Sequence, residues 1–418
     1  MKIWMLNHYA TEASSDGMWG RYYNLALGLS KNGHDVTVVA AGFMHNKFEE
    51  TRLYKDKDFD FEKIQDINYV WLKTFPYYKN NWRRILNIFT YGLRLYKWGK
   101  RAEKPDLIIA SSFHPLTWLS AYKLSKLHQA RFVVEVRDLW PETPICMGVI
   151  ARNSLIARIM RRFERFIYTI AEKIIVVLPY ADKYIATLGI PVEKVVYIPN
   201  GADPALFEPG MKDNKQFEDF VYRYPDLKNK SNFKVIYTGA HGNVNCLITL
   251  VKTAKELQDK NEKIHFYLIG SGPEKEGLIK TAQDLKLQNI TFCEQVPKII
   301  IPDILAMSDA PIILWKNMEV YKYGVSANKL FDYMASRRPI VYVGNSPNII
   351  DDAECGISVV PENVSELARA LINLSQLSNE KLLNMGENGY RYFRLNHTYD
   401  TLTNKLEEKV VKKSIFEV

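Results

Sequence analysis

Cysteine is scarce and dispersed in this sequence. Its four cysteines lie far apart, with no pair in CxxC spacing: Cys146, Cys246, Cys293 and Cys355. This pattern argues against a zinc site or a disulfide framework and fits a reducing cytosol. We therefore expect a cytoplasmic protein without a bound metal.

Long hydrophobic runs are also missing. No stretch approaches the ~20 apolar residues of a membrane-spanning helix, and the first apolar run is too short for a signal peptide. A P-loop and a Ser/His/Asp nucleophile motif are absent as well. Acidic residues are outnumbered, 47 against 56 Lys and Arg, for a formal net charge of +9. A soluble or peripheral protein with this charge favours nucleic acid, anionic lipid or phosphorylated substrates as partners.

What the sequence does contain is a repeated alternation of strand-like and helix-like patterns over 418 residues, a length that predicts more than one domain. Such alternation indicates parallel sheets covered on both faces, an α/β fold. Glycine and proline punctuate residues 201–210, which we interpret as the start of a second domain. The expected strands are 3–6, 36–41, 107–111, 132–136 and 174–178, then 234–238, 265–269, 290–293, 311–315, 340–343 and 357–360.

The stretch YKYGVSANKLFDYMASRRPIVYVG, 321–344, organises the second half. It predicts a loop freed by Gly324, a helix over about 327–336 and a buried strand after Pro339. A helix start of this kind seats anions such as a diphosphate. Lys329 and Asp332 lie three residues apart on one face, beside such a diphosphate and its ribose. The alternative is an ordinary amphipathic helix whose Lys and Asp are solvated.

Glycine-rich or polar segments follow several expected strands, where parallel sheets bind their ligands. In SSDGMWGRYY, Gly17 and Gly20 could admit an acceptor phosphate and Arg21 could supply charge, although a flexible loop explains the pattern equally well. His114 in SSFHP and Asp138 in EVRDLWPE follow separate strands and would converge on one rim.

The turn TGAHGN follows the first strand of the second set. Gly239 and Gly242 allow backbone to approach a phosphate, and His241 could donate to a phosphate oxygen. A similar turn, IGSGPE, is explained by a strand-to-helix connection alone.

Three segments together carry a family resemblance. SANKLFDYMASRRPIV, with NGAD at 200–203 and EVRDLWPE at 135–142, closely resembles the family-four retaining glycosyltransferases. The nearest subgroup is the bacterial enzymes of O-antigen and capsule synthesis, including N-acetylfucosamine transferases. The resemblance implies a GT-B fold: two Rossmann-like domains, 1–200 and 201–397, face across a cleft, and helices from about 398 to 418 cross back to the first.

The resemblance also implies an activity. Such an enzyme moves a sugar from a nucleotide diphosphate sugar, with UDP the favoured nucleotide, to a polyprenyl-diphosphate-linked acceptor. It works without metal or cofactor, peripherally on the inner face of the cell membrane, and has no nucleic-acid partner. The alternatives are a nucleotide-sugar epimerase of the same fold and a non-catalytic glycosyltransferase-like membrane subunit.

Site residues are carried over by motif. Asp138 would take the acceptor proton, and His114 would position the donor sugar. The donor would be held by the residues Gly239, His241, Gly242, Val296, Lys316, Ser326, Asn328, Lys329 and Asp332, with the base against Val296.

The chain departs from the family pattern at three places. Ala240 and Asn245 stand where many members have an Arg and a Lys on the diphosphate, and Gly324 replaces the first of two glutamates. Asp332 keeps the second glutamate in shortened form. Lys329 is the first candidate to replace the missing charge, and Lys316 is the second.

Four remaining segments have simpler interpretations. DFD at 58–60 is typical of a metal-binding DxD, but its charged surroundings favour a solvated loop, and LEEKVVKK favours a solvated helix face. In the amphipathic stretch 81–101, basic residues oppose Trp and Tyr, which leaves membrane contact and core packing open. For 154–173, we expect the apolar face to pack in the core.

Overall fold

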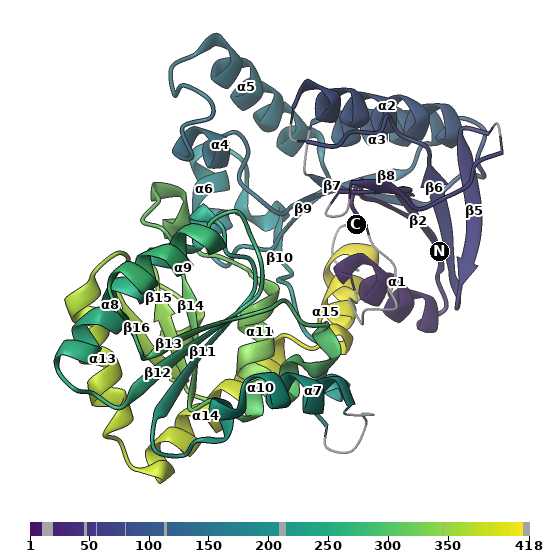
Figure 1. Ribbon diagram of the computed structural model, residues 1–418. Coiled ribbons are helices and arrows are strands. Elements are labelled where there is room, and N and C mark those ends of the chain that lie inside the picture. The colour runs from purple at the N-terminus through teal and green to yellow at the C-terminus, as the bar shows by residue number, and fades with distance from the viewer. Residues whose placement is uncertain are drawn as a thin grey trace. The chain divides into compact units, whose positions relative to one another are not determined.

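The computed structural model describes residues 1–10, 20–45, 48–55, 57–79, 81–112, 115–208, 215–345 and 347–412. The chain divides into two compact units, shown as ribbons in Figure 1. Unit 1 comprises Met1–Pro199 and Tyr399–Val418, and unit 2 comprises Asn200–Thr398. Both are α/β units with mostly parallel sheets. Within the described residues, no helix is both long and apolar enough to span a membrane.

The sheet of unit 1 has the strand order β10-β9-β8-β7-β1-β2-β6-β5. All neighbours are parallel except β5 and β6. The strands are β1 (Lys2–Leu6), β2 (Asp35–Ala41), β5 (Phe59–Ile64), β6 (Ile67–Leu72), β7 (Leu107–Ser112), β8 (Arg131–Val136), β9 (Lys173–Val176) and β10 (Val195–Tyr197), and β3 (Phe43–Met44) pairs with β4 (Glu49–Glu50).

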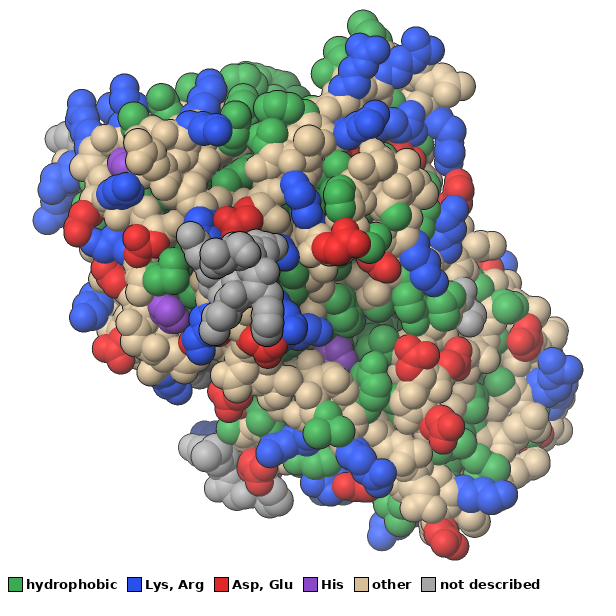
Figure 2. Space-filling view, turned by 180° about the vertical axis from the view of Figure 1, so that it is seen from behind, with side chains coloured by type: hydrophobic (Ala, Val, Ile, Leu, Met, Phe, Trp, Pro, Cys, Tyr) green, Lys and Arg blue, Asp and Glu red, His purple; other side chains and the backbone are tan. Residues whose placement is uncertain are grey.

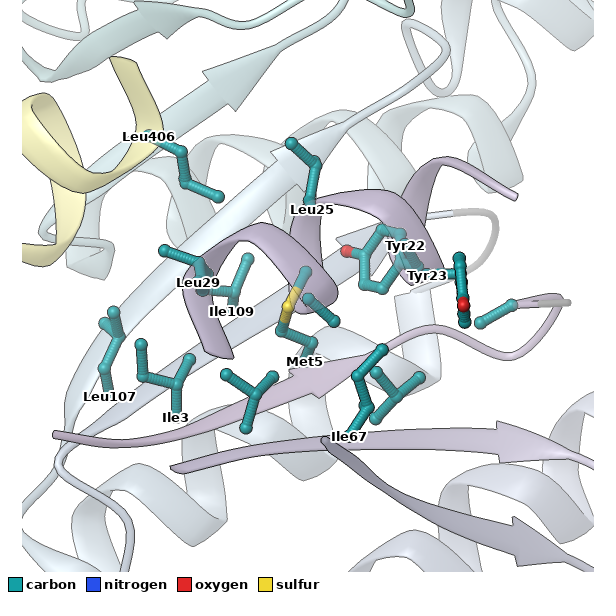
Figure 3. Packing of buried hydrophobic residues seen from close by; sticks show 14 of the residues in the cluster. Ile3, Met5, Tyr22, Tyr23, Leu25, Leu29, Ile67, Leu107, Ile109 and Leu406 are labelled. Atoms are coloured by element: carbon teal, nitrogen blue, oxygen red, sulfur yellow. The ribbon is translucent and has the colours of Figure 1, made fainter. Parts of the chain in front are cut away.

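Helices cover both faces of this sheet. They are α1 (Arg21–Lys31), α2 (Trp82–Gly99), α3 (Pro115–His128), α4 (Glu142–Cys146), α5 (Leu155–Ile170), α6 (Ala181–Thr187) and α15 (Tyr399–Leu406). On one face α1 and α15 bury apolar side chains against the strands, with Leu29 and Leu406 above Ile3 and Ile109 (Figure 3). The other face is covered by α2, α3 and α5 (Figure 1).

The end of the chain is part of the core of unit 1. A Cβ on Gly28 of α1 would lie 2.4 Å from Thr403 Oγ1, so α15 can approach only a glycine here. Val410 and Val411 are fully buried, and Arg131 donates to both of their carbonyl oxygens at 2.6 Å. The prediction of a solvated face for LEEKVVKK was therefore wrong for these residues.

Unit 2 has a six-stranded parallel sheet in the order β13-β12-β11-β14-β15-β16. Its strands are β11 (Phe233–Thr238), β12 (Ile264–Ile269), β13 (Ile290–Cys293), β14 (Ala310–Leu314), β15 (Ile340–Val343) and β16 (Gly356–Val359). Its helices are α7 (Lys215–Arg223), α8 (Ile248–Asp259), α9 (Lys275–Asp284), α10 (Ile301–Ala306), α11 (Asn328–Ala335), α12 (Ile349–Asp352), α13 (Val364–Ser375) and α14 (Asn379–Asn396).

Period-two alternation explains the two core layers of unit 2. Ile236 and Ile313 face one layer together with α10 and α11, whereas Val235 and Ile312 face the other together with α8 and α13. Strands buried on both faces read as nearly continuous apolar runs, which is why they were predictable from sequence.

The segment around DFD is not the expected solvated loop. Asp60 lies in β5, which pairs antiparallel with β6 at the edge of the sheet. Asp58 forms ion pairs with Arg94, at 3.3 Å, and with Lys97. These pairs fasten the hairpin to α2.

A buried ion pair joins α1 to β8. Arg21 Nε donates to Glu135 Oε1 at 2.8 Å, and both side chains are at most 3 % exposed. The two Nη atoms of Arg21 donate to the carbonyl oxygens of Ile198 and Pro199. Ser111 donates to the other Glu135 oxygen at 2.7 Å. The residues at which the chain leaves unit 1 for unit 2 are thus tied to the first helix of unit 1.

Charge keeps Glu135 ionised despite its burial. Burial alone would raise the pKa of Glu135, but Arg21, Arg137 and the Ser111 hydroxyl outweigh it and hold the pKa below its usual value. Because the folded pKa is depressed, the resulting stabilisation is present at neutral pH and is lost as the pH falls through that pKa.

Replacement of Arg21 should therefore destabilise unit 1 strongly. Arg21→Met leaves Glu135 buried without its main partner, which costs about 3–5 kcal/mol of the free energy of unfolding. Urea unfolding followed by tryptophan fluorescence measures this loss, because all tryptophans except Trp315 belong to unit 1. In the control Lys97→Met, which removes a pair with an exposed lysine, we expect at most about 1 kcal/mol. Equal losses in the two variants would contradict the role given to the buried pair.

Candidate functional site

The carboxyl edge of the sheet in unit 2 gathers most of the residues expected to bind a donor. β12, β11 and β14 are neighbours in the sheet, so the turns that follow them leave at the same edge. Gly239 N donates to Ile269 O at 2.9 Å and His241 N donates to Ser271 O at 2.8 Å, which joins TGAHGN to IGSGPE. The second turn is therefore more than a connection, because it supports the first.

Lys329 lies against the TGAHGN turn. Its Nζ donates to Tyr237 Oη at 2.8 Å and to Asn245 Oδ1 at 3.3 Å, and lies 4.1 Å from the centre of the Tyr237 ring. Tyr237 Oη and Asn245 Nδ2 both donate to Ala240 O, at 2.8 and 2.9 Å. Burial lowers the pKa of Lys329 to about 7. The lysine is thus held by neutral groups in a site that disfavours its cationic form.

The backbone of the turn requires glycine. Gly239 has φ of +132°, and a Cβ there would lie 3.3 Å from Lys329 Nζ. Gly270 has φ of +143°, and its Cβ would lie 2.0 Å from Gly239 O. Tyr333 of α11 accepts a hydrogen bond from Thr238 N at 2.8 Å, which fixes the helix to the end of β11. Turn and helix therefore form one rigid group.

His241 is completely buried in this group. Among the described residues, neither of its ring nitrogens has a hydrogen-bond partner. Burial, with the nearby charges of Lys275 and Lys329, lowers the pKa of His241 to about 4, so the ring is neutral at physiological pH. A buried polar ring without partners is costly unless a ligand satisfies it.

Two further lysines lie at this edge. Lys316, just after β14, donates from Nζ to Asn243 Oδ1 at 3.1 Å and from its backbone N to Val244 O at 2.9 Å. Lys275, in the first turn of α9, donates to Gly270 O at 2.8 Å and to Cys293 O at 2.5 Å. Lys275 therefore joins the IGSGPE turn to the end of β13.

Asp332 has a basic partner that the sequence analysis missed. Lys298 Nζ lies 3.4 Å from Asp332 Oδ1, and the side chains are 23 % and 8 % exposed. Burial raises the pKa of Asp332, and Lys298 opposes that rise. Lys298 comes two residues after Val296, which is half-buried against the core of unit 2.

The loop before α11 is fastened to the NGAD segment. Asn200 N donates to Ser326 Oγ at 3.1 Å, and Asn200 Nδ2 donates to Ser326 O at 2.6 Å. Asn328 is the exposed first residue of α11, and Ala327 at its N-cap offers no capping side chain. The N–H groups of the first turn of α11 are thus not capped by that residue.

The rim expected in unit 1 is described only in part. β7 and β8 pair in register, Ser112 with Val136, so the residues after both strands leave at the same edge. Asp138 follows β8 and is half-buried, and burial raises its pKa while Arg137 opposes the rise. Gly17 and His114 lie outside the described residues.

The acceptor loop differs from its prediction in the role of Arg21. Gly20 is the N-cap of α1 and its carbonyl oxygen accepts from Asn24. All three guanidinium nitrogens of Arg21 donate within unit 1, so its charge is committed to Glu135 and the backbone rather than to a ligand.

Several residues of the expected donor site carry only a weak signal in the sequence. Tyr237 and Tyr333 read only as core positions, and Asn245 reads as a lost cation. Lys298 is the exception, because a lysine directly after the Val296-Pro297 dipeptide is a candidate cation in the same way as Lys329 and Lys316.

Each unit of the chain matches a known family profile. Residues 15–206 match the family profile described as Glycosyltransferase Family 4, and residues 232–376 match the one described as Glycosyl transferases group 1. WbjE of Pseudomonas aeruginosa, named a probable glycosyltransferase, is 24% identical over 315 residues, which are 72% of this chain and 76% of that protein. WcaI of Escherichia coli K12, named for colanic acid biosynthesis, is 22% identical over 294 residues, 69% and 70% of the two chains.

Solved structures show the same fold at low identity. Sucrose-phosphate synthase from Thermosynechococcus elongatus superposes with a TM-score of 0.73 at 16% identity, over 98% of both chains. Anabaena HepE in complex with UDP-glucose gives 0.66 at 13%, over 98% and 99%. WaaG, a glycosyltransferase involved in lipopolysaccharide biosynthesis, gives 0.64 at 12%, over 98% and 100%. The chain thus carries a Glycosyltransferase Family 4 domain followed by a Glycosyl transferases group 1 domain, and its two Rossmann-like units have the GT-B fold.

Proposed function

We propose that this glycosyltransferase moves a hexose-type sugar, of the N-acetylfucosamine class by resemblance, from a UDP-sugar to a polyprenyl-diphosphate-linked acceptor. The observation that carries the proposal is the group formed by Lys329, His241 and the TGAHGN turn. The enzyme acts in cell-surface polysaccharide biosynthesis, as its relatives' names suggest, and binds peripherally to the inner face of the cell membrane.

The diphosphate is the part of the donor that this group suits. Lys329 supplies a cation, and the ring of His241 supplies a buried donor that lacks a partner. The backbone of Gly239 and Gly242 admits phosphate oxygens, and α11 presents its N-terminus. Lys316 adds a second positive charge at the same edge. Together they replace the arginine and lysine that many family members carry.

The nucleoside would lie between α11, which carries Asp332, and the segment after β13, which contains Val296. Asp332 accepts from the ribose hydroxyls, and the base lies against the backbone at Val296. A carboxylate placed for two hydroxyls loses one of these hydrogen bonds with a deoxyribose, so ribonucleotides are favoured over dTDP. HepE, whose structure was solved with UDP-glucose, supports a UDP donor.

Transfer with retention needs little chemistry from the protein. The diphosphate leaves from the face that the acceptor attacks, and charge that grows on it is stabilised by Lys329. Asp138, whose pKa is raised by burial, takes the acceptor proton. His114 positions the donor sugar.

Donor binding should take up a proton through Lys329. In the free enzyme its pKa is about 7, and a neighbouring diphosphate raises it. At about pH 8, UDP binding should therefore consume roughly one proton, and affinity should fall as the pH rises further. Calorimetry in buffers of different ionisation enthalpy measures the uptake. Lys329→Arg, always cationic, should bind UDP without it, and an uptake equal to that of the wild type would assign the proton to another group.

Lys298 should keep Asp332 ionised. In Lys298→Gln, the pKa of Asp332 should rise further, because burial already raises it and the opposing charge of Lys298 is lost. Since the ionised carboxylate binds the ribose, UDP affinity is lost as the pH falls through that pKa, and the loss should begin at higher pH in the variant. The measurement is the UDP dissociation constant against pH, with Lys298→Arg as the rescue and exposed Lys322→Gln as the control. An unchanged profile would show that Lys298 only packs beside Asp332.

The transfer reaction itself is tested through its product. Radiolabelled donor, offered with lipid-linked acceptor, should leave its label in organic-extractable lipid, which an epimerase or a non-catalytic subunit would not produce. UDP-, GDP- and dTDP-sugars compared by thermal shift identify the donor, because ligands that bind the folded state raise its stability. Asp138→Asn should keep the thermal shift and lower transfer by about 10²-fold or more. Wild-type transfer in that variant would exclude Asp138 as the base.

A further inference from the structure

The outer face of α2 carries an exposed apolar ridge. Trp82, Ile85, Phe89 and Leu93 recur at spacings of three or four residues and are 50–64% exposed. The side that packs on the sheet buries Tyr91, Leu95 and Trp98 together with Asn87, which donates to Thr74 Oγ1 and Phe75 O at 2.8 Å. The helix thus has one apolar face in the core and a second one turned to solvent.

A second ridge lies on α5. Leu155, Ile156, Ile159 and Phe166 are 45–72% exposed, whereas the inward face consists of Ala157, Glu164, Ile167 and Tyr168. In the loop before the helix, Met147 and Val149 are also exposed. The expectation that this apolar face packs in the core was therefore wrong.

Both ridges belong to one helical layer of unit 1. α3 lies between α2 and α5: Ser120 donates to Gly92 O at 2.9 Å on one side, and the rings of Tyr122 and Phe166 lie 5.9 Å apart on the other. Figure 2 shows hydrophobic and basic side chains gathered along the upper edge, where α2 and α5 lie in Figure 1.

The layer formed by α2, α3 and α5 is strongly basic. The three helices carry ten Lys and Arg, four on α2, two on α3 and four on α5, against a single acidic residue, Glu164. Glu164 is buried, accepts a hydrogen bond from Tyr184 at 2.8 Å, and has its pKa raised to about 8 by burial, so it is mostly neutral at pH 7. The whole chain, in contrast, is nearly balanced, with 56 basic and 47 acidic residues.

We propose that the outer face of α2, α3 and α5 docks on an anionic lipid bilayer through two points, the apolar ridges of α2 and α5. Ridge side chains enter the boundary between headgroups and acyl chains, and Arg83, Arg158, Arg162 and Arg165 contact lipid phosphates. A second copy of this face is a poor partner, because association would bring two strongly basic surfaces together.

Only part of the positive charge on α2 is available to a lipid surface. Arg94 and Lys97 on α2 are paired with Asp58, so part of its positive charge is already neutralised. Insertion of apolar side chains is the larger contribution, and salt should weaken binding to the bilayer without abolishing it. The proposal rests on the proposed function only for the location of the acceptor.

Vesicle co-sedimentation of the full chain tests the two points separately. One variant carries Ile85→Gln, Phe89→Gln and Leu93→Gln, and another carries Leu155→Gln, Ile156→Gln and Ile159→Gln. The control carries Leu383→Gln and Leu395→Gln on α14, where the side chains are equally exposed at 62% and 67%. Vesicles contain phosphatidylcholine alone or with phosphatidylglycerol. We expect wild type and control to bind the anionic vesicles, and each ridge variant to partition about tenfold less.

Three outcomes would overturn the proposal. The first is wild-type partitioning in either ridge variant. The second is a wild-type dimer that a ridge variant converts to monomers, which would make the ridges a self-association face. The third is absence of vesicle binding by the wild type. UDP thermal shifts in the same variants separate this test from the proposed function. If a ridge variant keeps its UDP thermal shift but loses vesicle binding, the result supports docking independently of donor binding. If the wild type shows the UDP thermal shift but binds no vesicles, docking is overturned and donor binding is unaffected.

Discussion

The proposed donor site depends on one lysine that is held by neutral partners. Lys329 is bound by a phenol and an amide, Tyr237 and Asn245, so its ammonium group is solvated but not neutralised. An ion pair at this place would neutralise the lysine within the protein and compete with a phosphate for the same charge. With neutral partners, the lysine charge is left for the proposed diphosphate, and desolvation makes that attraction stronger.

The same hydrogen bonds also shape the turn. Tyr237 and Asn245 both donate to the carbonyl oxygen of Ala240, so the groups that hold the lysine also hold the backbone next to it. Tyr333 fixes Thr238 from the other side. The asparagine that reads as a lost cation is therefore a support for the cation supplied by α11. The neutral Asn245 and the cationic Lys329 therefore belong to one hydrogen-bonded arrangement.

Sequence patterns predicted the strands of both sheets except β5, β6 and β10, because buried parallel strands read as apolar runs. The family motifs predicted the order of the two units. The β5–β6 hairpin was missed because its edge strand, FDFEKI, is rich in charge. Side-chain pairing was not predictable: Arg21 reads as a surface cation and is buried on Glu135, and Lys298 reads as a surface lysine and contacts Asp332. The orientation of α2, which the sequence left open, depends partly on Asn87, because this residue has hydrogen-bond partners inside unit 1 that no periodicity reveals.

The close packing of α15 on α1 has a consequence for how the chain is made. Leu402, Leu406, Val410 and Val411 are buried in the same core as α1, β1 and β2, yet they are separated from these elements by all of unit 2. During synthesis from the N-terminus, the first unit to be made cannot complete its core until the last residues leave the ribosome, while unit 2 is already whole. The first unit to be translated is therefore the last to complete its core, and the apolar face that α15 covers stays open for the whole time that unit 2 is being translated.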